Sequence, residues 1–387
     1  MTSKWLKRFA VIMALCMTIG LTGCNKEDGD SSSDSSDTSE EVVIPHKVGY
    51  IFHGNADING FAGQMSLQRV KAANRSNMET CYIDNVSVTD FEKAVKALVT
   101  AGCTDIVSGN AVFTNTLDAL ASKYMNINFI NYGSTSSPAN VSCYTELTYQ
   151  GAYVAGMVAA YNSEAQKIGF VGDPDLLLTT PSINAAALGM QLVYTDAKLY
   201  AANATRDGEI EEAIDALLDK GCDVIICYTA SPHSADYCRD KGVKYIGSLD
   251  YRGMEEEYPN MLMYYCCRRD SYFLAQFKQM QLDTWLPDEH VGSMSNDIVT
   301  VSDALSDAKD GTQKTIDALK PKLVSGDAYI FDGELKDTSG SVRIMQSDYM
   351  SDAQIRNMDW YVLGVEHLGS FRNMQSDLPP NTFEVKE

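Results

Sequence analysis

Two segments of the chain, residues 93–107 and 212–226, repeat one pattern, and this repeat constrains the fold more than any other feature. In each segment, apolar residues at helical spacing are followed by a Gly, a Cys and then a short apolar run. Gly102 and Gly221 stand where the two helices would end, and the apolar runs are typical of buried strands. The repeat therefore predicts two similar lobes of α/β structure in one chain.

The rest of the body continues this alternation of strands and helices. Strands are expected at residues 46–52, 105–107, 127–131, 167–172, 224–227 and 244–246. Helices are expected at residues 60–74, 117–124, 183–192 and 210–219, and after a cap at Thr89. Such spacing is typical of βαβ units, so we predict an α/β fold with parallel sheets in two similar lobes. Two such lobes bind a ligand in the crevice between them, at the carboxyl ends of the strands.

The N-terminus has the features of an export signal. Three basic residues precede an apolar stretch at residues 9–21, which is too short for a permanent membrane helix. The sequence Leu-Thr-Gly-Cys that ends at Cys24 resembles a bacterial lipoprotein lipobox. The resemblance implies a signal peptide at residues 1–23 and lipid on Cys24. The alternative is an ordinary secretory signal that contains a Cys.

Residues 24–45 follow the signal as an acidic and Ser-rich linker. Residues 25–41 contain no apolar side chain to offset the entropy of ordering, so we expect disorder and a reach of about 25 Å. The formal charge of −21 becomes −24 when residues 1–23, with three basic and no acidic residues, are removed. So acidic a chain disfavours binding to nucleic acid or to anionic lipid.

The body offers little for catalysis or for a metal. The sequence lacks GxSxG, P-loop and HExxH motifs, and its five histidines are scattered. None of the eight body cysteines forms a CxxC pair or a Cys/His cluster with zinc-ligand spacing. We therefore expect no enzyme, no cofactor and no metal. Export would permit disulfides, but the cysteine spacing specifies none, and we expect mostly free buried thiols.

Several stretches, in order, resemble the basic membrane protein family of bacterial substrate-binding lipoproteins. The resemblance runs from about residue 46 to residue 368 and covers nearly the whole body. The matching stretches are KVGYIFHGN (47–55), DINGF (57–61), YQGAYVAGMVA (149–159), KIGFVGDP (167–174), GCDVIICYTASP (221–232), KGVKYIGSLD (241–250), FDGELKDTSG (331–340) and MDWYVLGV (358–365).

The resemblance implies a type I periplasmic-binding-protein fold, in which two Rossmann-like lobes with parallel sheets are joined by a hinge of three crossovers. We expect the first part of lobe 1 at residues 46–145 and lobe 2 at residues 146–265. Residues 266–387 would return to lobe 1 and supply hinge crossovers and a tail. Members of the family deliver ligands, commonly purine nucleosides or bases, to an ABC importer. The partners implied are a small-molecule ligand and an ABC permease, and the protein is expected to be a monomer.

The resemblance also places candidate ligand contacts in the first lobe. Phe61 stands at the family's stacking position, although it could equally be a core aromatic at a helix start. Asn55 and Asp57 lie in the same loop and could bind the edge of a base, or could simply form a turn. Asn110 and Phe113 follow the strand at 105–107 and would face the crevice.

Three more candidates face the crevice from the second lobe and the returning segment. Tyr228 follows the strand at 224–227. Asp250 ends a strand where the family often has an acidic ligand contact, and its alternative role is a cap or turn. Arg268 lies near a basic or aromatic position of relatives and could pair with Asp250, or could be a surface charge.

Some residues depart from the family pattern and leave the ligand class open. Cys266 and the residues after it stand where some relatives have tryptophans, and Ala62 stands where many have Asn. The same fold could bind another small solute, such as a sugar. From a different class, the chain could be a sensory lipoprotein that signals to a membrane kinase.

Overall fold

The computed structural model describes residues 45–57, 60–133, 138–371 and 382–387. Within these ranges, Pro45–Glu387 forms one compact unit. The predicted signal peptide, the lipidation site Cys24 and the predicted linker lie outside the described residues, apart from the last residue of the linker, Pro45.

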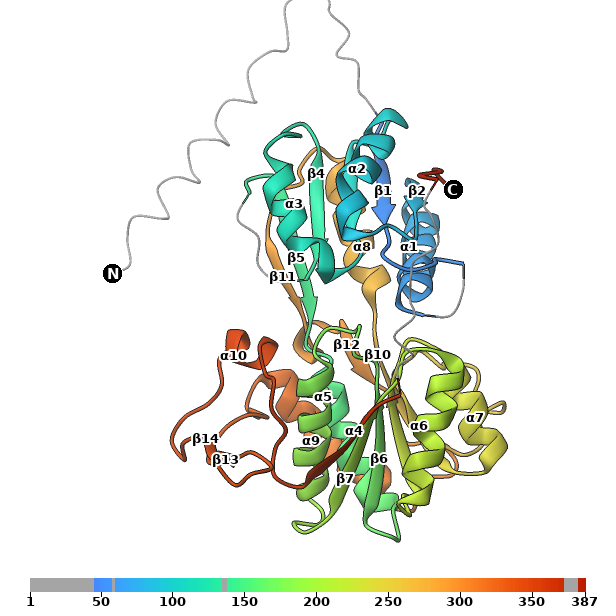
Figure 1. The fold of residues 1–387 in the computed structure, drawn as a ribbon, viewed down its shortest axis with the longest axis vertical. Coiled ribbons are helices and arrows are strands. Elements are labelled where there is room, and N and C mark those ends of the chain that lie inside the picture. The colour runs from blue at the N-terminus through green and yellow to red at the C-terminus, as the bar shows by residue number, and fades with distance from the viewer. Residues whose placement is uncertain (1–44, 58–59, 134–137, 372–381) are drawn as a thin grey trace, which may run out of the picture. The chain divides into compact units, whose positions relative to one another are not determined.

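The first lobe is built on a six-stranded sheet in which every neighbouring pair is parallel. Its strand order is β11-β5-β4-β3-β1-β2. The strands are β1 (Lys47–Ile51), β2 (Glu79–Ile83), β3 (Asp105–Ser108), β4 (Asn128–Tyr132), β5 (Val141–Glu146) and β11 (Glu289–Gly292). The helices of this lobe are α1 (Phe61–Ser76), α2 (Phe91–Thr100), α3 (Thr114–Ala121) and α8 (Arg269–Gln281), with short 3-10 turns η1 (Val88–Asp90) and η2 (Ala111–Phe113) (Figure 1).

The second lobe is built on a seven-stranded sheet with the order β12-β10-β9-β8-β6-β7-β15. Only the β10–β12 pair is antiparallel. The strands are β6 (Lys167–Gly172), β7 (Lys198–Asn203), β8 (Val224–Tyr228), β9 (Lys244–Gly247), β10 (Met261–Cys267), β12 (Val299–Val301) and β15 (Val365–Ser370). The helices are α4 (Tyr149–Asn162), α5 (Thr179–Gln191), α6 (Asp207–Asp219), α7 (His233–Lys241), α9 (Thr312–Ser325) and α10 (Asp352–Arg356), with the turn η3 (Met294–Asn296) and a small ribbon of β13 (Leu335–Lys336) and β14 (Val342–Ile344).

The two sheets share one plan, and the repeated segments occupy equivalent places in it. The unit α2–β3 of the first lobe corresponds to α6–β8 of the second, and each strand is central in its sheet. Gly102 and Gly221 lie between the helix and the strand of these units, with φ values of 85° and 84°, a left-handed conformation that glycine adopts at low cost. Cys103 and Cys222, the next residues, are both buried. The prediction of an α/β fold with two parallel-sheet lobes is thus confirmed.

Three crossovers connect the lobes. The chain passes from β5 to α4, returns from β10 to α8, and passes again from β11 to β12. Residues 299–370 then add β12 and β15 to the second sheet. Of the predicted segment 266–387, the described parts that join the first lobe are therefore α8, β11 and the end of the chain. There the backbone of Lys386 bridges to Tyr82, and Phe383 and Val385 pack against the first-lobe core.

Close helix packing fixes the start of the second lobe. Helix α4 is buried on nearly all sides and lies against α5. A Cβ added at Gly156 would lie 1.9 Å from the carbonyl oxygen of Ala186, and one added at Gly189 would lie 2.0 Å from that of Tyr153. Only glycine permits this approach, so the two helices form a rigid support for the cleft described below.

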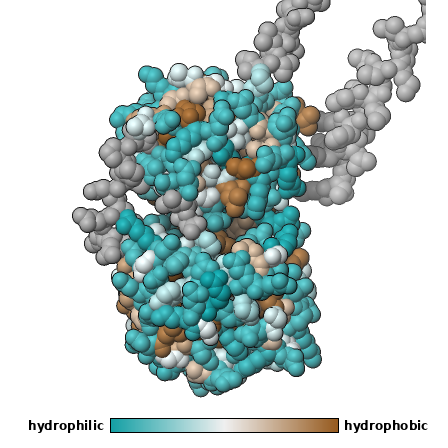
Figure 2. All heavy atoms as spheres, turned by 90° about the vertical axis from the view of Figure 1, so that its right-hand side faces the viewer, coloured by the Kyte–Doolittle hydropathy of each residue, from teal (hydrophilic) through white to brown (hydrophobic). Residues whose placement is uncertain are grey.

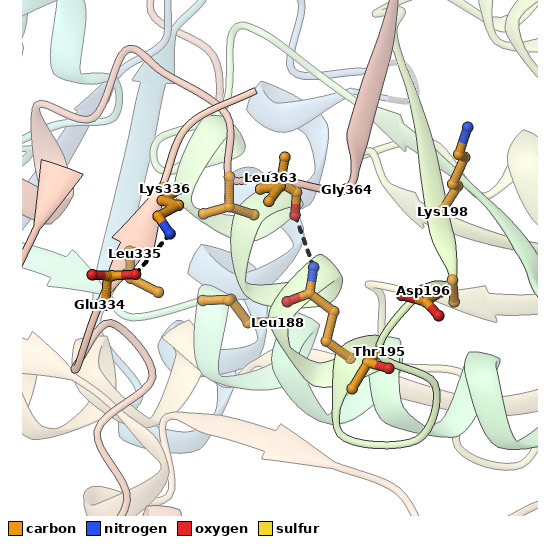
Figure 3. A pocket seen from close by; sticks show the side chains of 12 residues that line it. Leu188, Thr195, Asp196, Lys198, Glu334, Leu335, Lys336, Leu363 and Gly364 are labelled. Atoms are coloured by element: carbon orange, nitrogen blue, oxygen red, sulfur yellow. Dashed lines mark hydrogen bonds and ion pairs between the residues drawn. The ribbon is translucent and has the colours of Figure 1, made fainter. Parts of the chain in front are cut away.

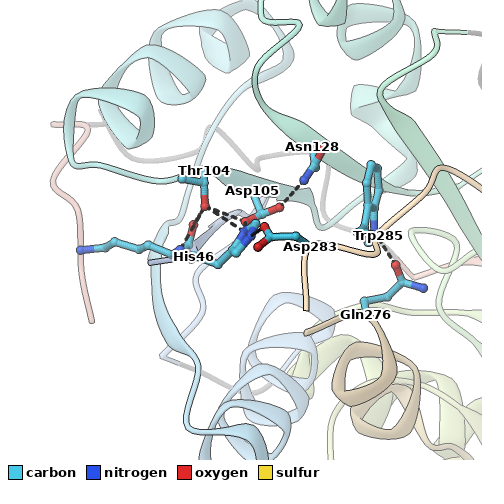
Figure 4. A network of polar contacts seen from close by, with 8 residues as sticks. His46, Thr104, Asp105, Asn128, Gln276, Asp283 and Trp285 are labelled. Carbon is cyan, nitrogen blue, oxygen red and sulfur yellow. Dashed lines mark hydrogen bonds and ion pairs between the residues drawn. The ribbon is translucent and has the colours of Figure 1, made fainter. Parts of the chain in front are cut away.

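A polar network ties together the beginnings of β1, β3 and β4 (Figure 4). The Nδ1 atom of His46 lies 2.6 Å from the fully buried Asp105, and its Nε2 atom lies 3.2 Å from Asp283 beyond the end of α8. Thr104 and Asn128 each donate to Asp105 at 2.7 Å. Burial opposes protonation of His46, but the hydrogen bonds and charges of Asp105 and Asp283 together outweigh it, so the pKa of His46 is raised.

Helix α2 begins differently from the prediction. Thr89 lies inside the 3-10 turn η1, and the side chain of Ser87 caps that turn by accepting from the backbone N–H of Asp90. Ser and Thr are both favoured as caps, so the local sequence does not distinguish Ser87 from Thr89.

The surface and the cysteines of the described residues are unexceptional for an acidic globular body. Figure 2 shows a face on which hydrophilic residues predominate and hydrophobic ones form small groups. All eight cysteines in the described ranges are free thiols, and seven are buried. Among the described residues, no helix is both long enough and apolar enough to cross a bilayer.

Candidate functional site

A narrow cleft lies between the lobes, at the carboxyl ends of the second-lobe strands. The first lobe contributes the beginning of α1 and the beginning of α8, and the second contributes residues that end or follow β6, β8, β9 and β10. The lining residues are Phe61, Gln64, Thr148, Leu176, Tyr228, Thr229, Ala230, Ser248, Leu249, Tyr265, Cys266, Cys267 and Arg269. This is where a two-lobed α/β protein is expected to hold its ligand.

The cleft encloses little free volume. Its free volume is about 30 Å³, and one water needs roughly 10–15 Å³ on the same measure. A purine therefore enters only when the lobes or the lining side chains move apart. Relative motion of two lobes about short crossovers is the usual way in which such a site opens.

Phe61 forms the first-lobe wall of the cleft. It is the first residue of α1 and follows Gly60, whose φ of 141° is a conformation that side chains disfavour. The half-buried ring lies 5.1 Å from the ring of Tyr132, measured between centroids. The guanidinium carbon of Arg269 lies 5.3 Å from the Phe61 centroid, in cation–π range. The ring is thus supported by two neighbours.

Arg269 is held in place by Glu146. The Nη2 atom donates to Oε2 of Glu146 at 2.7 Å, and the Glu146 side chain is fully buried. Tyr144 donates to the other carboxylate oxygen at 2.6 Å, and Tyr132 donates to Oε2 at 3.4 Å. Burial alone would lower the pKa of Arg269, but the charge of Glu146 outweighs it and raises that pKa well above its usual value. Arg269 is therefore charged.

Tyr228 lines the cleft from the second lobe, and its hydroxyl holds the neighbouring loop. The hydroxyl donates to the carbonyl oxygen of Leu177 at 2.8 Å. Burial raises the pKa of Tyr228, so the hydroxyl stays protonated. In the same loop Leu178 has φ 65°, a strained conformation for a branched residue that is often found at ligand sites. The Tyr228 ring faces the cleft while its polar end fixes the wall.

Asn55 and Asp57 occupy the loop before α1 without lining the cleft. The amide oxygen of Asn55 accepts from the backbone N–H of Asp57 at 2.8 Å, which is a turn contact. Asp57 accepts from the Tyr82 hydroxyl at 2.7 Å and from Lys386 Nζ at 3.2 Å. These two hydrogen bonds lower the pKa of Asp57, and burial together with the bond to Asp57 raises the pKa of Tyr82 to about 12.

Asn110 and Phe113 lie away from the cleft lining. The Asn110 side chain caps η2 by accepting from the N–H of Val112 at 3.0 Å. The turn η2 directs the Phe113 ring into the first-lobe core, where it is fully buried and lies 4.7 Å from the ring of Phe91. The expectation that Phe113 would face the crevice overlooked this turn, which reverses the direction of the chain after β3.

Asp250 and Arg268 also lie outside the lining. Asp250 forms a turn contact with Arg252, whose backbone N–H donates to it at 3.3 Å, and the Arg252 Nε atom lies 4.0 Å away. Arg268 precedes α8 and contributes its backbone N–H to Ile298 at 2.8 Å. No pair between Asp250 and Arg268 is present in the described structure. Of the eight candidate contacts, the structure brings Phe61 and Tyr228 together in the cleft.

Sequence reasoning missed Arg269, Glu146 and Tyr265. Arg269 is adjacent to the predicted Arg268, and one residue changes the direction of a side chain by roughly 100° on a helix. Glu146 is the last residue of the buried strand β5 and precedes the stretch that resembles the lobe-crossing helix. An acidic residue next to a predicted crossover is the sequence feature that could have identified Glu146. Tyr265 lies in an apolar strand, and its sequence context does not mark it as a site residue.

A larger cavity of about 540 Å³ lies on the second lobe, away from the cleft. It is formed by the end of α5, the start of β7, β13 and the loop before β15 (Figure 3). Lys336 pairs with Glu334 at 2.8 Å, and Gln191 donates to the carbonyl oxygen of Leu363 at 2.8 Å. Its charged groups are mostly exposed, and two of them, Glu334 and Lys336, pair with each other. Among the described residues, no cluster of His, Cys, Asp and Glu is arranged to hold a metal ion.

Two parallel-sheet lobes, three crossovers and a cleft at the strand ends define the type I periplasmic-binding-protein fold. A solved structure of a solute-binding protein of an ABC transporter system from Aeropyrum pernix K1 has the same fold, with a TM-score of 0.64 at 15% identity, covering 76% of this chain and 93% of that one. A solute-binding protein from Conexibacter woesei DSM 14684 matches with a TM-score of 0.60 at 18% identity, over 73% and 97% of the two chains.

Residues 46–248 match the model of the family described as ABC transporter substrate-binding protein PnrA-like, and the chain belongs to this family. A protein of Brucella abortus (strain 2308) named purine-binding protein is 25% identical over 327 residues, covering 83% of this chain and 93% of its own. A protein of Haloferax volcanii, named as an ABC transporter glucose-binding protein, is 30% identical over 170 residues, or 43% of each chain.

Family membership decides three points. The resemblance to the basic membrane protein family is confirmed, and so is the type I fold. The family consists of substrate-binding proteins, so the chain is a binding protein of an ABC transporter and not an enzyme.

Proposed function

We propose that this protein is a lipid-anchored, extracytoplasmic solute-binding protein that delivers a purine nucleoside or purine base to an ABC permease. The observation that carries the proposal is the Phe61 ring at the edge of the cleft, supported by Tyr132 and Arg269. A flat aromatic face next to a small number of polar groups suits a heteroaromatic ligand. The similarity to a protein named purine-binding protein, over most of both chains, supports the same ligand class.

The lipid anchor rests on the sequence around Cys24, and the extracytoplasmic location rests on that signal and on the family. Under this proposal the lipid holds the body at the outer face of the membrane, where the acidic linker separates it from the headgroups. The solute-binding body then stays close to the permease that it serves.

A sugar ligand is the second candidate, because one relative is named as a glucose-binding protein. That match covers 43% of this chain, whereas the match to the purine-binding protein covers 83%. A sensory role remains distinct from both. Permease and ATPase genes beside the gene would favour import, and a histidine kinase gene would favour sensing.

Mass spectrometry of small molecules released from the freshly purified, denatured protein tests the ligand class without prior choice of a candidate. The proposal expects a purine base or nucleoside in stoichiometric amount. Release of a sugar in that amount would favour the second candidate. When the protein is isolated empty, saturable heat on titration with purines supplies the same test.

A further inference from the structure

The hydrogen-bonding character of the cleft points to one subclass of purine. Among the lining residues, Arg269 is the charged side chain, and the other polar groups are hydroxyls, thiols and the amide of Gln64. Within the described lining there is no carboxylate. A guanidinium only donates hydrogen bonds, so a ligand edge that meets Arg269 has to present acceptors.

The charge of Arg269 does not require an anionic ligand. Glu146 neutralises it at 2.7 Å and is itself satisfied by Tyr144 and Tyr132. The cleft wall is therefore electrically balanced while it remains rich in donors. Such a wall suits a neutral ligand with an acceptor edge, because an extra negative charge would lie near the carboxylate of Glu146.

Two buried donors in this region have no partner among the described residues. They are the Nε atom of Arg269 and the hydroxyl of Tyr265, and both residues line the cleft. Tyr265 as a whole is 2% exposed. Buried polar groups in native proteins are nearly always hydrogen-bonded, so we expect a bound ligand to pair with these two donors.

Arg269 also lies next to the Phe61 ring, against which a flat ligand would stack. Its guanidinium is within 5.3 Å of the Phe61 centroid and 6.0 Å of the Tyr132 centroid. A flat ligand against Phe61 would thus extend one edge toward the guanidinium fork. In a 6-oxopurine that edge carries two acceptors, O6 and N7, which match arginine, whereas a 6-aminopurine places an amino donor in the position of O6.

Within the purine function proposed above, on which this inference rests, we propose that the cleft selects 6-oxopurines over 6-aminopurines and that Arg269 is the specificity-determining residue. Glu146 acts through Arg269 as a positioning residue. It holds one nitrogen of the fork and so fixes the direction of the others.

Titration calorimetry of the full chain with hypoxanthine and adenine tests this selection, because the two bases differ at position 6. The unmutated protein should bind hypoxanthine about tenfold more tightly or better, the order expected for a matched arginine edge. R269Q should lose this preference. R268Q is the matched control, since the same change is made one residue away and outside the lining, and it should keep the preference.

Folding of each variant is checked by its melting temperature without ligand. Because R269Q leaves Glu146 without its cation, the double variant R269Q/E146Q is included, and it should also show no preference. Equal or tighter binding of adenine by the unmutated protein would overturn the inference and leave the purine function standing. A preference retained in R269Q or in R269Q/E146Q would overturn the role of Arg269. Failure of the unmutated protein to bind either base or their nucleosides would instead overturn the proposed function.

Discussion

Nη2 of Arg269 donates to Oε2 of Glu146 at 2.7 Å, and this ion pair joins two of the three crossovers between the lobes. Glu146 is the last residue of β5, just before the chain crosses to α4. Arg269 is the first residue of α8, just after the chain returns from β10. The pair therefore fixes the hinge region and one wall of the cleft at the same time.

E146A should destabilise the protein by about 3–5 kcal/mol, because it leaves the buried Arg269 cation without its partner. Urea unfolding at neutral pH measures the loss. The exposed pair of Glu92 and Lys123 is the matched control, and E92A should cost less than about 1 kcal/mol. Equal effects of the two substitutions would contradict the structural role of the buried pair.

The pH dependence of stability should include a contribution from His46. Its folded-state pKa is raised above the ordinary value of 6.5, so its stabilising contribution is complete below that value and is lost as the pH rises through the raised pKa. The difference in unfolding free energy between the unmutated protein and H46Q should therefore shrink above pH 6.5. D283N removes the exposed partner and leaves Asp105, so it should preserve most of this dependence. A difference that grows with pH would contradict the account.

Features of the fold that depend on neighbouring residues could be predicted from the sequence, and features that depend on the tertiary structure could not. The units α2–β3 and α6–β8 were predictable because helical spacing and a terminal glycine such as Gly102 are local features. The side-chain directions at the cleft are not local. Arg269 and Arg268 are indistinguishable until the end of β10 and the start of α8 are known. The expectation that Phe113 faces the crevice is wrong because η2, capped by Asn110, directs the ring into the core.

Lys386 should position the loop before α1 from a distant part of the chain. Its backbone pairs with Tyr82 at the free edge of β2, and its Nζ atom contacts Asp57 and Asp84 at 3.2 and 3.1 Å. K386A should speed amide hydrogen exchange in residues 52–57 and weaken ligand binding several-fold, because the Asp57 loop loses a contact. K386R keeps the charge and should behave like the unmutated protein. Unchanged exchange and affinity in K386A would exclude the positioning role.

The lipid anchor is tested at Cys24, which lies outside the described residues. C24S removes the thiol that lipidation requires, so the variant should accumulate with an uncleaved signal or be released into the medium. Fractionation with N-terminal mass analysis distinguishes these products from the native form. A membrane-bound C24S protein with normal N-terminal processing would contradict the lipoprotein assignment.

Substitutions of Phe61 and Phe113 should have different effects, because Phe61 lines the cleft and Phe113 lies in the first-lobe core. F61A should weaken binding by about 1–3 kcal/mol, as for an aromatic contact at a binding hot spot, with little change in the stability of the free protein. F113A should instead lower stability by about 3–5 kcal/mol, because it leaves a cavity in a packed core. Binding titrations and urea unfolding of both variants give the comparison.

The central claim, that a purine binds against Phe61 in the inter-lobe cleft, is tested most directly by calorimetric titration of the unmutated protein and F61A. The titrants are hypoxanthine, inosine, adenine and glucose. The account predicts one purine site per chain that F61A weakens, and no measurable heat from glucose. Saturable binding of glucose with no purine binding, or purine affinity unchanged by F61A, would contradict it.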